Sequence, residues 1–319
     1  MSFYQRTHPK KTKRRDTIFN FQKQPINILI ITAISILLLS ACGGNTSNNE
    51  SAAEDDNPNS LDMGQISWEE NIAITNMWKF ILEEEGYEVN LHLLDIGTQM
   101  AALENDELDI SPEIWLPVQD AEYVAQYEDA INFSEETWYD NAKVGLVVPA
   151  YMDYLDSIED LNANKESLNG EITGFDAGAG TMLVVEEAME AYELDYELTA
   201  SSEPAMLTAL QQAITNEEDI VVPLWNPHRV FSEMDLKYLD DPQNIFGEAE
   251  KIHHATRQNF HEDYPEVDQW LKNWKMDDEQ IGELMSYVSE AENEGKEALE
   301  GAEKWVNDNR NLVNQWLEK

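Results

Sequence analysis

The feature that most constrains the fold is an alternation of short apolar segments with amphipathic segments, which occurs twice along the chain. In the first stretch, Asn71–Glu85 carries apolar residues at helical spacing between two strand-like segments, Gln65–Trp68 and Tyr87–Leu94. In the second, helical patterns over Thr181–Tyr192 and Ala205–Thr215 again alternate with strand-like segments. Such alternation is typical of a parallel sheet covered by helices, so the sequence predicts an α/β fold.

The length and the spacing of these elements predict two lobes. From Gln65 onward about 255 residues remain, enough for two lobes of ordinary size. The continuous apolar run Val144–Val148 predicts a fully buried strand that crosses between them. We predict that the first lobe begins with residues 63–146, that residues 147–246 form the second lobe, and that residues 247–319 complete the first with mostly helical structure.

The N-terminus has the pattern of a secretion signal. Residues 1–25 carry seven basic side chains against one acidic side chain and lead into the apolar run Ile26–Leu39. The run is short for a membrane span, and Leu39-Ser40-Ala41-Cys42 resembles the lipobox of bacterial lipoproteins in all four positions. We therefore predict a signal peptide over residues 1–41 and lipidation of Cys42.

The segment after Cys42 has a different composition. Cys42 is the only cysteine of the chain, so an internal disulfide is excluded. Gly43–Ser60 is made of glycine, asparagine, serine and acidic residues with almost nothing apolar, a composition that cannot bury enough surface to fold. We predict that residues 42–62 form a flexible acidic tether, which keeps the folded part near the outer face of the cell membrane.

The charge of the chain excludes some partners. The net charge is −44, and because residues 1–41 contribute six positive units, the remainder carries −50. Nucleic acid is an improbable partner, since a phosphate backbone requires a basic surface. The acid excess suits solubility in a salty or alkaline exterior. Calcium sites are the alternative, but no calcium-binding loop of the D-x-D-x-D-G type is present, and we expect no metal site.

Three tryptophans follow short apolar runs and precede turns or helix starts. They are Trp68, Trp115 and Trp225, and their positions put three large rings at strand ends, where open α/β sheets bind ligands. A set of electron-rich rings suits a diffuse positive charge such as a quaternary ammonium, held by cation-π attraction. The alternative is that these tryptophans are ordinary core or interface residues.

One loop has the character of an anion site. Gly174–Gly180 joins a predicted strand to a predicted helix, and its glycines allow backbone N–H groups to face a ligand at the helix N-terminus. A nucleotide site is not indicated, because no phosphate-binding glycine motif is present in the right register. A small carboxylate fits better, and a tight turn without a ligand remains the alternative.

At this point the sequence resembles the glycine betaine and proline betaine binding proteins of ABC importers. The resemblance covers Gln65 to about Trp316 and rests on QISWEEN, EIWLP, DNAKVGLVVP, ITGFDAGAG, LWNPH, DLKYLDDP and EKIHHATRQNF. It implies a two-lobed periplasmic-binding-protein fold of type II with the ligand in the cleft between the lobes. It also implies delivery of the ligand to a membrane permease driven by an ATPase.

The resemblance assigns roles to individual residues. Trp68, Trp115 and Trp225 match the three walls of the family's aromatic cage. Gly174 and Phe175 match the backbone pair whose N–H groups hold the ligand carboxylate. The expected ligand is glycine betaine or a related betaine.

One position departs from the family. Close betaine binders have a histidine five residues after the cage tryptophan of the WLP motif, whereas this chain has Asp120 after Trp115. Asp120 can point away from the ligand, or His228 or Arg229 can take over the anion. Alternatively the ligand lacks a carboxylate, in which case Glu113, on the same strand face as Trp115, complements choline or protonated trimethylamine oxide.

Other candidates carry two interpretations. Trp138 is a possible fourth wall or a core residue, and His228 is otherwise a structural hydrogen-bonding residue. The histidines His253, His254 and His261 fall in a region predicted to be helical and polar, so we expect surface or capping positions. Without a nucleophile–base pair or metal-type histidine spacing we predict no catalytic residues, no cofactor and no enzyme. A surface lipoprotein without a transport role remains the rival class.

Overall fold

The computed structural model describes residues 59–319, so the predicted signal peptide, Cys42 and most of the predicted tether lie outside it. The strands are β1 Ser60–Gln65, β2 Glu88–Leu93, β3 Ile110–Leu116, β4 Ile131–Pro149, β5 Glu171–Thr173, β6 Glu197–Thr199, β7 Val222–Asn226, β8 Leu236–Tyr238 and β9 Glu250–Arg257. The helices are α1 Glu69–Glu84, α2 Ile96–Glu104, α3 Ala121–Tyr127, α4 Gly180–Ala191, α5 Glu203–Asn216, α6 Val230–Glu233, α7 Phe260–Asp263, α8 Pro265–Asn273, α9 Asp278–Asn293, α10 Ala298–Asp308 and α11 Arg310–Trp316. Two short 3-10 turns, Ile158–Asp160 and Asn162–Asn164, follow β4.

The main sheet is mixed rather than purely parallel. Its strands run in the order β2-β1-β3-β9-β4-β7, with β8 paired to β4, and β5 and β6 form a small parallel pair. Strand β1 is parallel to β2 and β3, whereas β9 is antiparallel to both β3 and β4.

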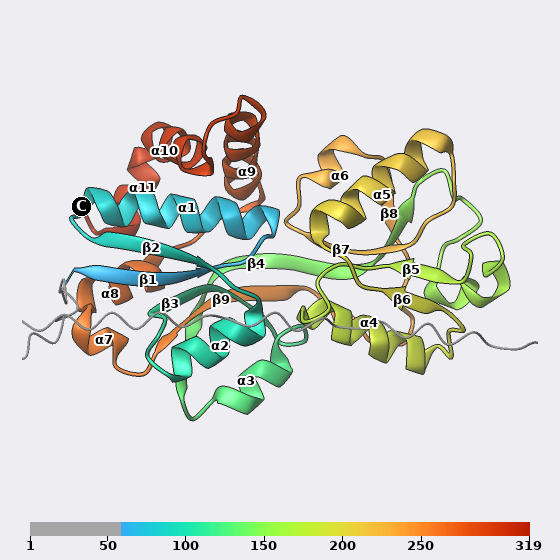
Figure 1. Cartoon of the computed structure of the whole chain (residues 1–319), viewed down its shortest axis with the longest axis horizontal. Helices are drawn as coiled ribbons and strands as arrows, with labels where there is room; N and C mark the ends of the chain where they lie inside the picture. Colours follow the sequence, from blue (N-terminus) through green and yellow to red (C-terminus); the bar gives the residue numbers. More distant parts are fainter. Residues whose placement is uncertain (1–58) are drawn as a thin grey trace, which may run out of the picture. The chain divides into compact units, whose positions relative to one another are not determined.

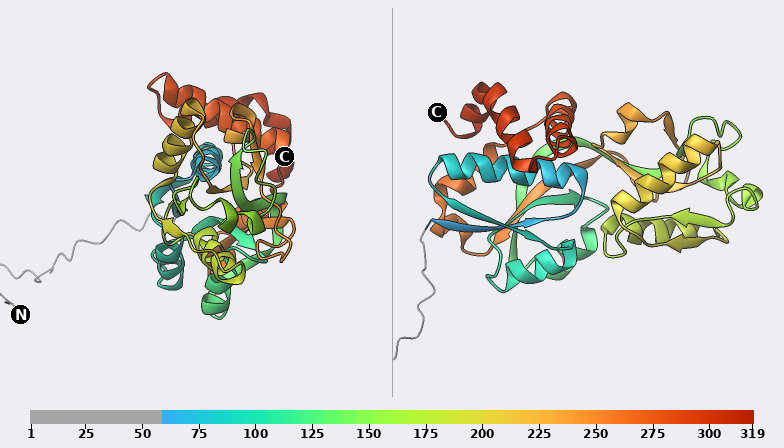
Figure 2. Two further views of the ribbon diagram at one scale, coloured as in Figure 1. Left: turned by 90° about the vertical axis from the view of Figure 1, so that its right-hand side faces the viewer. Right: turned by 45° about the horizontal axis from the view of Figure 1, so that its top comes forward.

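Strand β4 connects two groups of elements (Figure 1). Its residues Ile131–Ala142 pair with β9, and from Lys143 the same strand pairs with β7 and β8. The first lobe holds β1–β3, β9, α1–α3 and α7–α11, and the second holds β5–β8 and α4–α6 (Figures 1 and 2). Val144, Leu146, Val147 and Val148 are buried, so the predicted buried strand is confirmed. The predicted lobe boundaries at residues 146 and 246 remain predictions.

Helix α1 shows how the sequence pattern becomes packing. Its first turn carries Glu69 and Glu70, which suits the positive end of the helix dipole. The stripe formed by Ile74, Trp78 and Ile81 is buried against the sheet and against α9 and α10, which lie over the same face (Figure 2).

Three details differ from the sequence-based expectation. The C-terminal region begins with strand β9 rather than with helix, so His253 and His254 lie on a strand. His254 is buried, and burial lowers the pKa of its ring to about 3, so it is a core residue and not a capping one; His261 is exposed as expected. The sheet also starts at Ser60, inside the predicted tether. No helix within residues 59–319 has the length and apolar character needed to cross a membrane.

Candidate functional site

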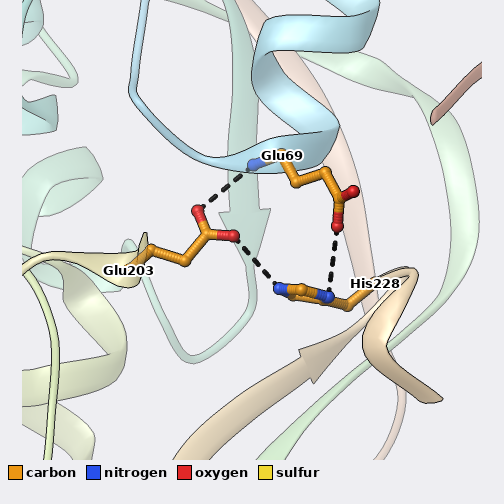
Figure 3. Close-up of side chains that lie close together, drawn as sticks. All are labelled: Glu69, Glu203 and His228. Carbon is orange, nitrogen blue, oxygen red and sulfur yellow. Dashed lines mark hydrogen bonds and ion pairs between the residues drawn. The ribbon is translucent and has the colours of Figure 1, made fainter. Parts of the chain in front are cut away.

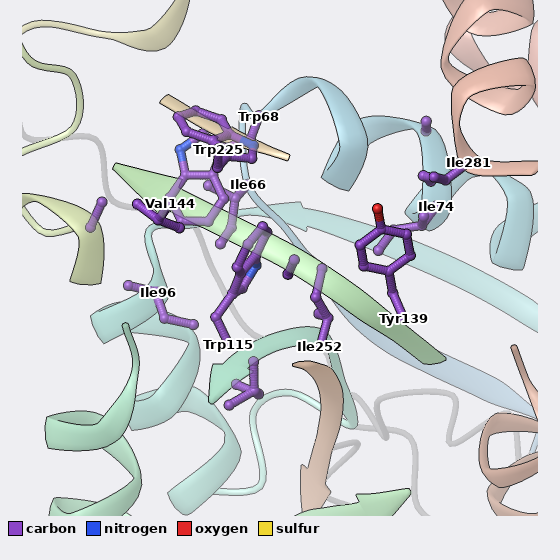
Figure 4. Close-up of a cluster of buried hydrophobic side chains, with 14 of the residues drawn as sticks. Ile66, Trp68, Ile74, Ile96, Trp115, Tyr139, Val144, Trp225, Ile252 and Ile281 are labelled. Atoms are coloured by element: carbon purple, nitrogen blue, oxygen red, sulfur yellow. The ribbon is translucent and has the colours of Figure 1, made fainter. Parts of the chain in front are cut away.

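A cavity lies between the two lobes, where the ends of β3 and β7 and the middle of β4 meet the N-termini of α1 and α4. It is lined by Trp68, Glu70, Trp115, Gln119, Asp120, Val144, Phe175, Gly180, Thr181 and Trp225. Trp68, Trp115 and Trp225 gather around Val144 of β4 (Figure 4). The three predicted tryptophans therefore line one cavity, although they are 47 to 157 positions apart in the sequence.

Four aromatic rings form the walls, and we call Trp68, Trp115, Phe175 and Trp225 the aromatic cage. The ring of Trp225 lies 6.0 Å from that of Trp68 and 4.9 Å from that of Phe175, measured between centroids. Trp68 and Phe175 meet edge to face at 6.1 Å. The exposed fractions of Trp68, Trp115 and Trp225 are only 9, 5 and 3%, so a cation between these rings would be desolvated, where cation-π attraction is strongest.

Carboxylates hold two of these rings in place. The Trp115 indole N–H donates to Glu113 over 2.6 Å, and Glu113 also accepts a hydrogen bond of 2.7 Å from the Asn71 side chain. The Trp68 indole N–H donates to Asp176 over 2.9 Å, from the first lobe to the second. Glu113 therefore orients a cage wall from behind, as its position two residues before Trp115 allows.

Glu70 is the most unusual group in the cavity. It is fully buried on the first turn of α1, and neither carboxyl oxygen has a hydrogen-bond partner among residues 59–319. Burial raises the pKa of Glu70 well above its ordinary value, and the nearby charges of Glu113 and Glu203 raise it further. Burial likewise raises the pKa of Glu113, whose carboxyl group lies within hydrogen-bonding reach of Glu70. Two buried carboxyl groups this close do not both ionise readily, so the charge of either one opposes ionisation of the other.

Asp120 is tied to the backbone of the cage. Its carboxyl group accepts a hydrogen bond of 2.7 Å from the Trp115 N–H and also lines the cavity. Burial raises its pKa to about 7, and the nearby charges of Glu250 and Glu113 act in the same direction. Near neutral pH this group is therefore partly protonated and can donate a hydrogen bond, which an ionised aspartate cannot do.

Another side of the cavity carries candidate hydrogen-bond donors. Helix α4 begins at Gly180, and Gly180 and Thr181 of its first turn line the cavity; the first N–H groups of a helix have no acceptor within the helix itself. A Cβ atom on Gly180 would lie 2.0 Å from the Gln119 carbonyl oxygen, so only glycine permits this contact between the lobes. The Gln119 side-chain amide is buried, lines the cavity and has no hydrogen-bond partner within the described residues.

A polar cluster beside the cage joins the lobes (Figure 3). The Glu69 N–H donates to Glu203 over 3.2 Å, and His228 Nε2 lies 3.1 Å from the other Glu203 oxygen. The Val230 N–H donates to His228 Nδ1, so the ring proton lies on Nε2. Arg229 adds an ion pair to Glu69.

The same cluster is the group of side chains in residues 59–319 whose spacing would suit a metal ion, with donor atoms of Glu69, Glu203 and His228 within 4.8 Å of one another. Both ring nitrogens of His228 are already used in contacts within the protein. We therefore assign the cluster as a contact that holds the lobes together.

Residues 59–308 match the family described as the substrate-binding domain of the ABC-type glycine betaine transport system. The chain belongs to this family. Its members are binding components of transport systems, which agrees with a cavity that has aromatic walls and lies between two lobes.

Relatives of this betaine-binding family support the assignment. The glycine betaine/carnitine transport binding protein GbuC of Listeria monocytogenes serotype 1/2a (strain 10403S) is 41% identical over 156 residues, which cover 48% of this chain and 51% of that protein. The chain thus matches about half the length of this relative.

Solved structures share the two-lobed architecture. The glycine betaine/L-proline-binding protein ProX from Borrelia burgdorferi is 30% identical, with a TM-score of 0.76 over 81% of this chain and 96% of that chain. Lactococcal OpuAC, in its closed conformation with glycine betaine, is 31% identical, with a TM-score of 0.75 over 81% of this chain and 99% of that chain. The predicted α/β fold and the resemblance to betaine-binding proteins are confirmed.

Several residues predicted for this betaine-type site lie elsewhere than expected. The Gly174 N–H donates to the Thr199 carbonyl over 2.8 Å, so in this structure it is not directed at the cavity. Phe175 enters the site through its ring as a cage wall. His228 lies behind Trp225, with ring centroids 5.1 Å apart, and bonds to Glu203 instead of lining the cavity.

Trp138 takes the core role that the sequence left open. It is 1% exposed and stacks on Trp274 with the ring centroids 4.4 Å apart. Its indole N–H donates to the Pro112 carbonyl over 2.9 Å. It is absent from the lining of the cavity.

The sequence reasoning missed Glu70, Gln119 and Thr181. Glu70 had a signal, because it lies four positions before Ile74 and therefore on the apolar stripe of the helix. A carboxylate on such a stripe must be buried. Gln119 and Thr181 had no comparable signal, since their role depends on the approach of two lobes.

Proposed function

We propose that this protein captures glycine betaine or a related quaternary ammonium compound in the cavity between its lobes. The observation that carries the proposal is that Trp68, Trp115 and Trp225 line one buried cavity. Each desolvated cation-π contact contributes about 2 kcal/mol, so three walls supply much of the binding energy of a small cation.

The anionic end of a betaine then meets the α4 N-terminus. The N–H groups at Gly180 and Thr181 and the Gln119 amide are donors on one side of the cavity. Protonated Asp120 adds a donor where the family has a histidine. In this assignment the Gly174 N–H, which donates to Thr199, does not hold the carboxylate, whereas the predicted role of the Phe175 N–H remains a prediction.

Capture involves closure of the lobes. The Trp68–Asp176 bond, the Glu69–Glu203 bond and the hydrogen bond of 2.8 Å from the Tyr123 hydroxyl to the Gly178 carbonyl join the two lobes beside the cavity. The closed form is then the one presented to the permease and ATPase of an ABC importer. In this proposal the protein works outside the cytoplasm and is held to the membrane by lipid on Cys42.

The test is a calorimetric titration of the protein with glycine betaine and with 3,3-dimethylbutanoate, in which carbon replaces the charged nitrogen without a change of shape. We expect glycine betaine to bind at least about a hundredfold more tightly, since only it has the cation that the rings attract. Equal affinity would mean that the cavity selects shape alone. No heat with either compound, nor with choline or trimethylamine oxide, and no ligand-induced compaction in solution scattering would favour the non-transport surface lipoprotein.

A further inference from the structure

Glu70 is a buried acid whose position the cage alone does not explain. It lines the cavity, is completely buried, and has two carboxyl oxygens without a hydrogen-bond partner in residues 59–319. Buried polar atoms almost always have a partner, and each exception calls for a reason. A ligand in the cavity supplies that reason, because Glu70 is one of the groups that it would touch.

The groups around Glu70 are acidic on every side. Glu113 faces it from β3 and Glu203 from the N-terminus of α5. Glu69 precedes it on α1, and Asp120, at the start of α3, is itself affected by the charge of Glu113.

No basic side chain offsets this charge directly. In the part of the chain that the structure describes, none forms an ion pair with Glu70. The His228 ring contacts Glu203, and Arg229 forms ion pairs with Glu69 and Glu233. The Trp225 indole N–H is close enough to favour the ionised form of Glu70, although it makes no hydrogen bond of ordinary geometry.

We propose that Glu70 is a specificity-determining residue that sets the net charge of the ligand: when it is ionised, the cage favours a quaternary ammonium without a carboxylate, such as choline, over a betaine. The inference rests on the proposed function, since it concerns the same cavity. A quaternary ammonium has no N–H group, so Glu70 acts on its diffuse charge without a hydrogen bond. This leaves the carboxyl oxygens as free of donors as they are in the structure.

The preference follows from the sign of two interactions. Ionised Glu70 attracts the ammonium of either ligand, but a betaine also brings a carboxylate a few ångströms away, which the same charge repels. Choline brings only the attraction. Because the pKa of Glu70 is raised, its ionised fraction increases as the pH rises, so the preference for choline must increase in the same direction.

The test compares the affinities of the protein for choline and glycine betaine by calorimetry at about pH 5.5 and about pH 8.5, for the unchanged protein and for Glu70→Gln. In the unchanged protein we expect the affinity ratio of choline to glycine betaine to rise with pH, by about tenfold or more once Glu70 is ionised. In Glu70→Gln, the ratio should be lower at high pH, and the pH dependence that remains should be the part contributed by Asp120. Glu187→Gln, on the exposed face of α4, is the matched control and should behave as the unchanged protein does.

Asp120→Asn separates the two acids that titrate in the cavity. If the rise of the ratio with pH persists in Asp120→Asn and disappears when Glu70→Gln is added to Asp120→Asn, the inference holds; a rise that is lost in Asp120→Asn alone would overturn it. An unchanged ratio in folded Glu70→Gln, as judged by its circular dichroism, would also overturn it while betaine binding itself stands. Absence of binding of either ligand to the unchanged protein would instead remove the proposed function.

If Glu70→Gln does not fold, a second variant tests the inference. Glu70→Asp, which withdraws the charge by one methylene, should lower the ratio at high pH; an unchanged ratio counts against the inference.

Discussion

Two tryptophan clusters of this protein are both buried but differ in what surrounds them. In the aromatic cage, the indole N–H groups of Trp68 and Trp115 donate to carboxylates, and the rings face a cavity. A second cluster, which we call the core stack, packs ring against ring in the first lobe, with a centroid separation of 4.4 Å and an interplanar angle of 7° between Trp138 and Trp274. The core stack consists of Trp78, Trp138, Trp274, Trp305 and Trp316.

The difference teaches that neither burial nor residue type distinguishes a binding tryptophan from a structural one. The N–H groups of Trp78, Trp274 and Trp305 have no hydrogen-bond partner within residues 59–319, and their rings are covered by one another. Carboxylates orient the cage rings of Trp68 and Trp115, whereas the Trp225 N–H has no hydrogen-bond partner within the described residues and Trp138 of the core stack donates to Pro112. What marks the cage is therefore that its rings line a cavity, and what marks the core stack is that its rings are covered by other rings.

The largest effect is expected in the core stack. Trp274→Ala should lower the free energy of unfolding by about 3 to 5 kcal/mol, because it removes a fully buried ring and leaves a cavity. Urea denaturation followed by circular dichroism measures this, and the folded fraction should still bind glycine betaine normally. A loss below about 1 kcal/mol would show that the two clusters do not differ in their structural role.

A smaller effect on binding is expected in the cage. Trp115→Ala should weaken the binding of glycine betaine by about 2 kcal/mol, roughly 30-fold, because one desolvated wall is lost. Trp115→Phe should retain part of the affinity. Calorimetric titration of both variants checks this, with Trp138→Phe as the control from the core stack; if that control weakens binding as much as Trp115→Ala does, the distinction fails.

We expect the free energy of unfolding to depend on pH through a group beside the aromatic cage rather than through the core stack. The pKa of Asp120 is raised by burial to about 7 from an ordinary value of 3.8, so the folded state holds a proton that the unfolded state releases. The contribution of protonated Asp120 to the free energy of unfolding is therefore fully present below about pH 4 and is lost as the pH rises through about 7. Asp120→Asn should be more stable than the unchanged protein by about 1 to 3 kcal/mol at pH 8 and equally stable at pH 4. Thermal melts of both proteins at the two pH values measure this; the same stability difference between Asp120→Asn and the unchanged protein at pH 4 and pH 8 would contradict the prediction.

Much of the fold was predictable because local patterns agree with the final packing. The apolar stripe of α1 has the period of a helix, and the short continuous apolar run Val144–Val148 in β4 is typical of a strand buried on both faces. Strand β9 was not predicted, because polar residues such as Lys251 and His253 hide its pattern. Its pairing with β3 and β4, far away in sequence, makes it a strand.

The candidate site was predictable only in part. Trp68, Trp115 and Trp225 were identified from their positions at or near strand ends. The parallel pair β1 and β3 brings Trp68 and Trp115 to one edge of the sheet, and Trp225 meets them from β7 of the second lobe. The sequence could not tell that Trp138 stacks on Trp274, because the choice between core and cavity depends on which rings reach it. Nor could it tell that the Gly174 N–H pairs with Thr199 while Gly180 faces the cavity.

The sequence by itself determined the alternation of strands and helices, the three cage tryptophans and the family of the chain, because each depends on residue types at short spacings. Only the tertiary structure decided which carboxyl groups are buried together. Glu70, Glu113 and Glu203 lie on α1, β3 and α5, and their mutual effect on protonation exists only after the two lobes have closed around them. Electrostatic coupling depends on distance and on the exclusion of water, and both are properties of the folded chain.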